Sequence, residues 1–205
     1  MSEALPEWLK VLHCPVCGKL SLEFIEAHSE IPFFGKMIMA SWKCSNCGYR
    51  HTDVFSLEFR EPLRYILKVK GPEDLYAKVI RSSSGTIRIP ELGATIEPGP
   101  IAQGFITNVE GVLERIKDAT KSFLVLSDSE HEKRKCIDVL NKLKLASQGK
   151  LPFTLILEDP LGISMITPSY DGQEIIIEKL SDEDLKRLKF GSSIILQLSK
   201  KLQEP

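Results

Sequence analysis

The sequence predicts a protein that is mainly β with some α-helix (α+β), in which a small N-terminal module precedes a larger β-rich domain that carries a helical hairpin. Three observations lead to this prediction. Two matched CxxCG motifs lie within the first 48 residues of the 205-residue chain. Short segments of β-type composition, separated by turn residues, begin at about residue 60 and return after about residue 150. Between these two groups, apolar residues repeat at intervals of three and four, as on one face of a helix.

The two CxxCG motifs predict that the first module is a zinc ribbon. They contain four of the five cysteines of the chain: Cys14, Cys17, Cys44 and Cys47. Two residues between the cysteines of a pair let both sulfurs reach one ion, and two such turns supply the four thiolates of a closed tetrahedral zinc site. The glycine after each pair tolerates the positive φ that such a turn needs. We therefore expect one structural Zn²⁺, and we expect the ribbon to unfold without it.

Other roles for the cysteines and their neighbours are weaker. A redox dithiol is the main alternative to metal binding, but the paired spacing favours zinc. A catalytic zinc needs an open coordination position, which four thiolates do not leave. With four cysteines present, we expect His13 and His51 to support the ligands or face solvent. Cys136 lies on the apolar face of a predicted helix and is expected in the core, a redox role being the alternative.

The segments around the motifs have the character of strands. Leu20, Leu22 and Phe24 alternate with polar residues after the first motif, and the residues that lead into and out of the second motif are also of β type. The 26 residues between Cys17 and Cys44 exceed the commonest ribbon spacing, so we expect more than a minimal hairpin at the fingertip. The ribbon is predicted to occupy residues 1–58.

Residues 59–205 are predicted to form one β-rich domain with a helical hairpin inserted at about 111–148. Short strands at this spacing suggest a sandwich or barrel, and the strands before and after the hairpin are expected to pair because neither group alone can close a core. Ser127 or Asp128 is the expected cap of the second helix, and residues 181–184 form the capping box of one late helix. The predicted strands are 65–69, 75–80, 86–89, 95–96, 153–157, 163–167 and 174–180.

Composition and charge argue against several functional classes. The formal net charge is −1, which disfavours binding to the phosphates of a nucleic acid. No basic stretch leads into an apolar run and no segment approaches the length of a membrane span, so we expect a location in the reducing cytoplasm. The phosphate-loop, dinucleotide-binding, HExxH and GxSxG motifs are missing from the sequence, and an enzyme is therefore not expected.

Several phrases of the sequence carry a more specific resemblance. Over about residues 14–170 the chain resembles the Zpr-type zinc-finger proteins, whose eukaryotic members carry two copies of a module that this chain has once, as in the archaeal branch. It departs from the family pattern at Ile163, where Asn is frequent, and at residues 33–35, which replace a more charged fingertip. The phrases are Ile31–Phe34, Cys44–Arg50, Ile89–Leu92, Gly104–Gly111 and Leu151–Ser164.

The resemblance implies both a fold and a partner. It implies a double-stranded β-helix or jelly-roll-like β-domain beside the ribbon, with a helical hairpin. Eukaryotic members of the family are folding factors for translation elongation factor 1-alpha, so that factor is the candidate client. The resulting hypothesis is a zinc-binding adaptor or folding chaperone for a protein client. The alternative is a zinc ribbon that binds nucleic acid or acts in transcription.

Six residues are candidates for contact with a client. The apolar run 31–34 at the fingertip has few core neighbours, so it either binds a partner or packs on the second domain. Glu91 and Asp159 lie among Pro and Gly, where tight-turn chemistry is the favoured interpretation and partner contact the alternative. The predicted contact residues are Ile31, Pro32, Phe33, Phe34, Glu91 and Asp159.

Overall fold

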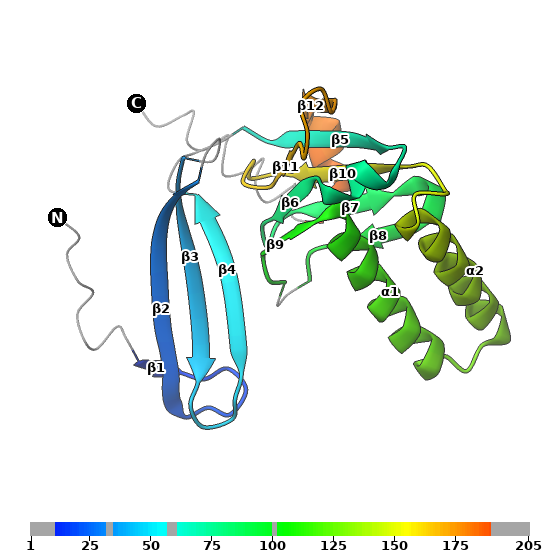
Figure 1. Cartoon of the computed structure of the whole chain (residues 1–205). Helices are drawn as coiled ribbons and strands as arrows, with labels where there is room; N and C mark the ends of the chain where they lie inside the picture. The colour runs from blue at the N-terminus through cyan, green and yellow to red at the C-terminus, as the bar shows by residue number, and fades with distance from the viewer. Residues whose placement is uncertain (1–10, 32–34, 57–60, 100–101, 190–205) are drawn as a thin grey trace. The chain divides into compact units, whose positions relative to one another are not determined.

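The computed structural model describes residues 11–31, 35–56, 61–99 and 102–189, and its mixture of strands and helices confirms the α+β class. The chain divides into two compact units. Unit 1 comprises Met1–Phe59 with Gln103–Phe105, and unit 2 comprises Arg60–Ala102 with Ile106–Pro205. Figure 1 shows the elements of each unit.

Unit 1 is built on an antiparallel four-stranded sheet in the order β1-β2-β3-β4. Its strands are β1 (Val11–His13), β2 (Leu20–Ile31), β3 (Gly35–Cys44) and β4 (Arg50–Ser56). Strands β2 and β3 pair without interruption from Leu22 opposite Cys44 to Ile31 opposite Gly35. The long span between the motifs is therefore built on two long paired strands, labelled β2 and β3 in Figure 1.

The described residues of unit 1 form a small core that contains metal-ligand residue types. Cys14, Leu22 and Cys44 are buried together, with Trp42 packed against them. Two residue pairs further along the sheet, the Trp42 ring lies 5.2 Å from the Phe24 ring and 5.2 Å from the His51 ring, measured between centroids. So little apolar material supplies limited stability on its own.

Unit 2 contains a five-stranded sheet in the order β12-β5-β10-β7-β8 and a three-stranded sheet in the order β11-β6-β9. As predicted, strands before and after the hairpin pair, because β10 lies between β5 and β7. Alternate residues of β5, Tyr65, Leu67 and Val69, are buried with Leu155 and Ile87 in the core. The strands are β5 (Leu63–Val69), β6 (Lys78–Arg81), β7 (Thr86–Ile89), β8 (Ala94–Ile96), β9 (Phe105–Asn108), β10 (Phe153–Asp159), β11 (Met165–Thr167) and β12 (Ile175–Lys179).

One predicted strand of unit 2 is partly wrong. Residues 75–80 were expected to be extended, but a 3-10 turn, η2 (Pro72–Tyr76), precedes β6. Proline suits the first position of such a turn, and the Asp74 carboxylate accepts hydrogen bonds from the amides of Lys70 and Gly71, at 2.7 and 3.1 Å. A second turn of this type, η3 (Pro90–Leu92), follows β7.

Three helices complete the described part of unit 2. Helices α1 (Val109–Leu126) and α2 (Glu130–Ser147) form the predicted hairpin, and α3 (Asp182–Arg187) begins with the predicted capping box. The expected cap of α2 is wrong by one residue: Ser129 is the N-cap, whereas the Ser127 hydroxyl donates to the Glu132 carboxylate at 2.6 Å. Cys136 is buried on α2, as expected. In the described part of the chain, none of the helices combines the length and the apolar character needed to cross a membrane.

Candidate metal centre and partner surfaces

Each CxxCG motif forms a tight turn with the same hydrogen-bond pattern. In the first turn the Gly18 amide donates to the Cys14 carbonyl, and the Cys14 amide donates to the Lys19 carbonyl, both at 2.8 Å. The second turn repeats the two bonds from Gly48 and Cys44, at 3.1 and 2.8 Å. The glycines have φ values of 69° and 75°, the left-handed region in which a Cβ is unfavourable. The turns thus hold both cysteine pairs in matching geometry.

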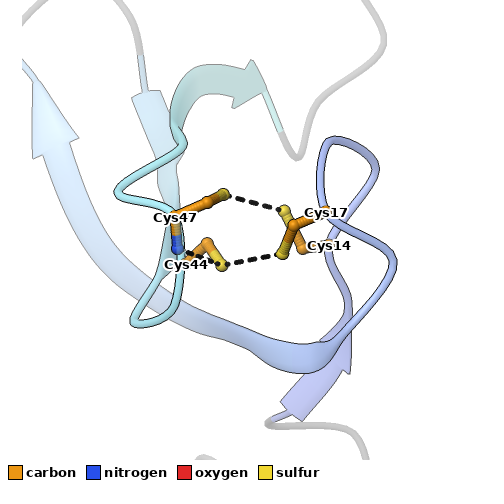
Figure 2. Close-up of side chains that lie close together, drawn as sticks. All are labelled: Cys14, Cys17, Cys44 and Cys47. Carbon is orange, nitrogen blue, oxygen red and sulfur yellow. Dashed lines mark hydrogen bonds between the residues drawn. The ribbon is translucent and has the colours of Figure 1, made fainter.

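The four cysteine sulfurs converge on one point. The Cys14 and Cys47 sulfurs are 3.6 Å apart, those of Cys17 and Cys44 are 3.7 Å apart, and all four lie within 4.8 Å of one another. Figure 2 shows the two pairs facing each other across the space between the turns. A tetrahedral zinc ion with bonds of about 2.3 Å requires sulfurs about 3.8 Å apart. The four cysteines are therefore positioned to hold a metal ion such as zinc.

The electrostatics of the thiols fit the same conclusion. A hydrogen bond with the Ser21 hydroxyl, 3.2 Å from the sulfur, lowers the pKa of Cys44 to about 6 against the opposing effect of burial. A hydrogen bond from the Tyr49 backbone lowers the pKa of Cys47, but burial and the three neighbouring thiols raise it to about 12. Four thiols at these distances repel one another once ionised, and a bound cation relieves that repulsion.

The two histidines next to the motifs lie outside the sulfur cluster. His13 Nδ1 is 2.9 Å from the Gly18 carbonyl oxygen, so its ring supports the first turn. His51 lies against Trp42 on the neighbouring strand. Among the described residues, the group that could hold a metal consists of the four cysteines alone. This placement agrees with the expectation that the histidines are not ligands.

Asp159, a predicted contact residue, is fully buried at the end of β10. Its Oδ1 accepts hydrogen bonds from Ser84 Oγ at 2.7 Å and the Leu161 amide at 2.9 Å. Its Oδ2 accepts from Ser82 Oγ at 2.7 Å and from the hydroxyl and amide of Ser164 at 2.5 and 2.7 Å. These bonds join the turn after β10 to the turn after β6. Partner contact by Asp159 stays a prediction, and it would require the carboxylate to leave all of them.

Glu91 has an internal role of the same kind in η3. Its carboxylate accepts hydrogen bonds from the amide and the hydroxyl of Thr154 on β10, at 3.0 and 2.8 Å. Burial alone would raise the pKa of Glu91, but the hydrogen bonds from Thr154 outweigh it and lower the pKa below its usual value. Contact with a partner stays a prediction here too. Of the predicted fingertip, residues 32–34 lie outside the described residues, and only the backbone pairing of Ile31 is described.

The structure adds one apolar surface that the sequence did not single out. At the C-terminal end of α1, Phe123, Val125 and Leu126 are 51%, 83% and 80% exposed. We call these three residues the hairpin end. Large apolar side chains gathered on an exposed surface are typical of contact sites. The spacing of apolar residues could not predict the hairpin end. Such spacing predicts which residues share one face of a helix, but not which part of the helix stays exposed to solvent.

Two protein-family models match the chain. The model of the ZPR1 zinc-finger domain matches residues 9–58, and the model of the ZPR1 jelly-roll domain matches residues 73–190. The first match contains all four clustered cysteines. The second contains the helical hairpin and most strands of unit 2.

Curated relatives show the same similarity over nearly the whole chain. An uncharacterised ZPR1-like protein of Methanocaldococcus jannaschii is 43% identical over 185 residues, which are 90% of this chain and 91% of the relative. One of Pyrococcus horikoshii is 38% identical over 188 residues, 90% of this chain and 82% of the relative. The zinc finger chaperone zpr1 of Schizosaccharomyces pombe is 31% identical over 163 residues, 77% of this chain but 35% of the relative.

Proposed function

We propose that this chain, which belongs to the ZPR1 zinc-finger family, is a zinc-binding adaptor or folding chaperone that acts on a protein client. The observation that carries the proposal is the exposed apolar hairpin end, Phe123, Val125 and Leu126. Such a surface can cover apolar groups of an incompletely folded client. If all four clustered cysteines bind the metal, as we propose below, they leave it no open position. The name of the fission-yeast relative, a zinc finger chaperone, supports this role.

The zinc ligands we propose are Cys14, Cys17, Cys44 and Cys47, with one ion per chain. The short distances between their sulfurs and the matching turns support this assignment. Bound zinc would supply structural cross-linking and no reactive position, because four thiolates complete its coordination. Elemental analysis should give one zinc per chain, and the cobalt-substituted protein should have the absorption spectrum of four sulfur ligands. Fewer sulfur ligands would overturn the assignment.

The client we propose is translation elongation factor 1-alpha, encountered in the cytoplasm. The resemblance to eukaryotic family members motivates this choice. In the proposed mechanism, the fingertip at residues 31–34 and the hairpin end cover apolar surface of the client during folding and are released when that surface closes. No chemical step is assigned to the protein, since covering and releasing a surface needs only differential affinity for two client states.

A refolding assay tests this function. The elongation factor from the same host is diluted from urea with and without the zinc-loaded protein, and the yield of nucleotide-binding factor is measured. We expect the yield to rise, and to rise less with Phe33→Ala/Phe34→Ala or with Val125→Ser/Leu126→Ser. Ile137→Ser is the matched control, because Ile137 is an exposed apolar residue on the other helix of the hairpin.

Two outcomes would contradict the proposal. An unchanged yield, together with no association between the two purified proteins, would exclude the elongation factor as the client. Salt-sensitive binding of nucleic acid by the zinc-loaded protein would favour the alternative function instead.

A further inference from the structure

A groove of about 410 Å³ lies in unit 2 along the edge strand β12. Ile66 of β5 and Ile176 of β12, which are direct cross-strand partners, provide its apolar lining. Lys68, Lys70 and the Tyr170 ring line it as well. The groove thus combines an apolar strip with polar and charged walls.

The strand beside the groove is an exposed sheet edge. In the described part of the chain β12 pairs with β5 alone, so its other side offers unpaired main-chain groups. Three consecutive isoleucines, residues 175–177, form its first half, and Ile176 and Ile177 are 37% and 57% exposed. Exposed edges with β-branched residues are templates for pairing with another extended chain, and natural proteins usually protect them. This edge is therefore suited to strand addition.

A buried carboxylate holds two further lining residues of the groove in place. Asp74 accepts hydrogen bonds from the Tyr170 hydroxyl at 2.8 Å and from Gln173 Nε2 at 2.9 Å, in addition to the two amides described above. Tyr170 also lines a second hollow of about 300 Å³, with the exposed Tyr76. Tyrosine rings held in place supply contact area with little loss of conformational entropy.

The charges in the groove indicate which segment it would accept. The ammonium groups of Lys68 and Lys70 form no ion pair with a described residue. Lys68 lies on β5 two residues after Ile66, so both project from the same face of the sheet, and Lys70 follows directly after the end of the strand. Glu73 and Glu174 line the groove nearby, which makes a strongly acidic ligand less suitable than one with a single carboxylate.

We propose that this groove binds an extended segment of a partner protein, which adds to the edge of β12. The segment places an apolar side chain on Ile66 and Ile176 and a carboxylate beside Lys68 and Lys70. The inference rests on the proposed function, because an incompletely folded client is the partner that offers extended segments of this kind.

Binding of labelled client by groove variants tests the inference. The probe is elongation factor 1-alpha carrying a fluorophore and diluted from urea, and the dissociation constant is measured by anisotropy. We expect Ile176→Asp and Lys68→Glu/Lys70→Glu each to weaken binding by about tenfold. The matched controls are Ile106→Asp, at a strand isoleucine that is 49% exposed elsewhere in unit 2, and Lys78→Glu on β6.

A second variant and a second probe separate the possible failures. Tyr76→Ala removes an exposed ring and should weaken binding about threefold without changing thermal unfolding, whereas misfolding of a variant would change both. Reduced and carbamidomethylated α-lactalbumin, which is permanently unfolded and carries no added carboxylates, is measured in parallel. If it binds and the elongation factor does not, the proposed client is wrong while the groove is still tested by the same variants.

Four results would overturn the groove inference. Equal affinity of wild type and groove variants would do so and would leave the proposed function intact. Failure to bind either probe would overturn the groove together with the function. Displacement of the probe by a synthetic peptide of residues 190–205 would identify the chain's own C-terminal segment as the occupant. Self-association of wild type that Ile176→Asp abolishes would identify a second copy of the chain.

Discussion

Replacing Asp159 with alanine is expected to destabilise unit 2 strongly. The substitution leaves the buried amide of Ser164 and the part-buried amide of Leu161 without their acceptor. An unsatisfied buried donor costs about 1–3 kcal/mol, so the two together cost at most about 2–6 kcal/mol. The hydroxyls add little, because Ser82 Oγ lies 2.9 Å from Ser84 Oγ and can bond to it instead. The loss is large against the roughly 5–15 kcal/mol of a whole domain.

Asparagine at the same position should have an intermediate effect. Both carboxylate oxygens of Asp159 accept from a backbone amide, one from Leu161 and the other from Ser164. The side-chain amide of asparagine keeps one acceptor oxygen but turns a donor toward the second backbone amide. We therefore expect Asp159→Asn to cost about 1–3 kcal/mol, roughly half the cost of alanine.

Urea unfolding with two probes measures these effects. Both long helices belong to unit 2, so helical ellipticity follows that unit, whereas both tryptophans, Trp8 and Trp42, belong to unit 1 and report on it by fluorescence. Asp138→Ala is the control: this exposed residue pairs with Lys142, and its loss should cost less than about 0.5 kcal/mol. Wild-type stability of Asp159→Ala combined with loss of client binding would refute the reasoning and support the partner-contact hypothesis.

Three further predictions concern the metal, acid stability and a close contact. Chelation of the metal should unfold unit 1, because structural zinc supplies about 10–16 kcal/mol in isolated fingers. Tryptophan fluorescence should then change while helical ellipticity stays the same. Simultaneous loss of both signals would contradict this prediction. Hydrogen bonds with Ser181 and Arg64 hold the pKa of Asp184 well below its usual range, so its contribution to stability is present above about pH 4 and lost as the pH falls further. Acid titration of ellipticity should show a smaller drop in Asp184→Asn, and an equal drop would exclude this carboxylate as the cause. Gly85→Ala would place a Cβ 2.6 Å from Ser164 Oγ. It should lower the free energy of unfolding, measured by urea titration, by about 1–3 kcal/mol. An unchanged free energy would mean that the Ser164 hydroxyl moves aside freely.

The parts of the structure that follow from local chemistry were predictable from the sequence. Cysteine spacing and the following glycines predicted the metal turns, because two-residue spacing and positive φ at Gly18 and Gly48 are requirements of that geometry. Short segments of β-type composition between turn residues predicted β5 and β7, whose inward residues are buried. Family membership and the α+β class were likewise predicted from the sequence, and both are confirmed.

Features that depend on particular side-chain contacts were not predictable. Leu75 is buried as a strand residue would be, but the Asp74 carboxylate binds the preceding amides and produces a turn. Ser127, Asp128 and Ser129 are all good helix caps by composition, but the Ser129 hydroxyl is the one that accepts from the Glu132 amide, while the Ser127 hydroxyl donates to the Glu132 carboxylate. The internal roles of Glu91 and Asp159 depend on contacts with Thr154 and the serines, which are distant in sequence.

The pairing of β2 with β3 means that metal binding also depends on the alignment of the two strands. Cys44 lies opposite Leu22, and a shift of the hairpin by one residue would turn the Cys44 sulfur to the other face of the sheet. Zinc can therefore bind only the correctly aligned hairpin, and its binding selects against misaligned forms. The last described pair, Ile31 with Gly35, lies nine pairs further along, about 30 Å from the metal at about 3.4 Å per residue. An ion bound at one end of the β2–β3 pair thus determines which side chains lie on each face of these strands along their whole length.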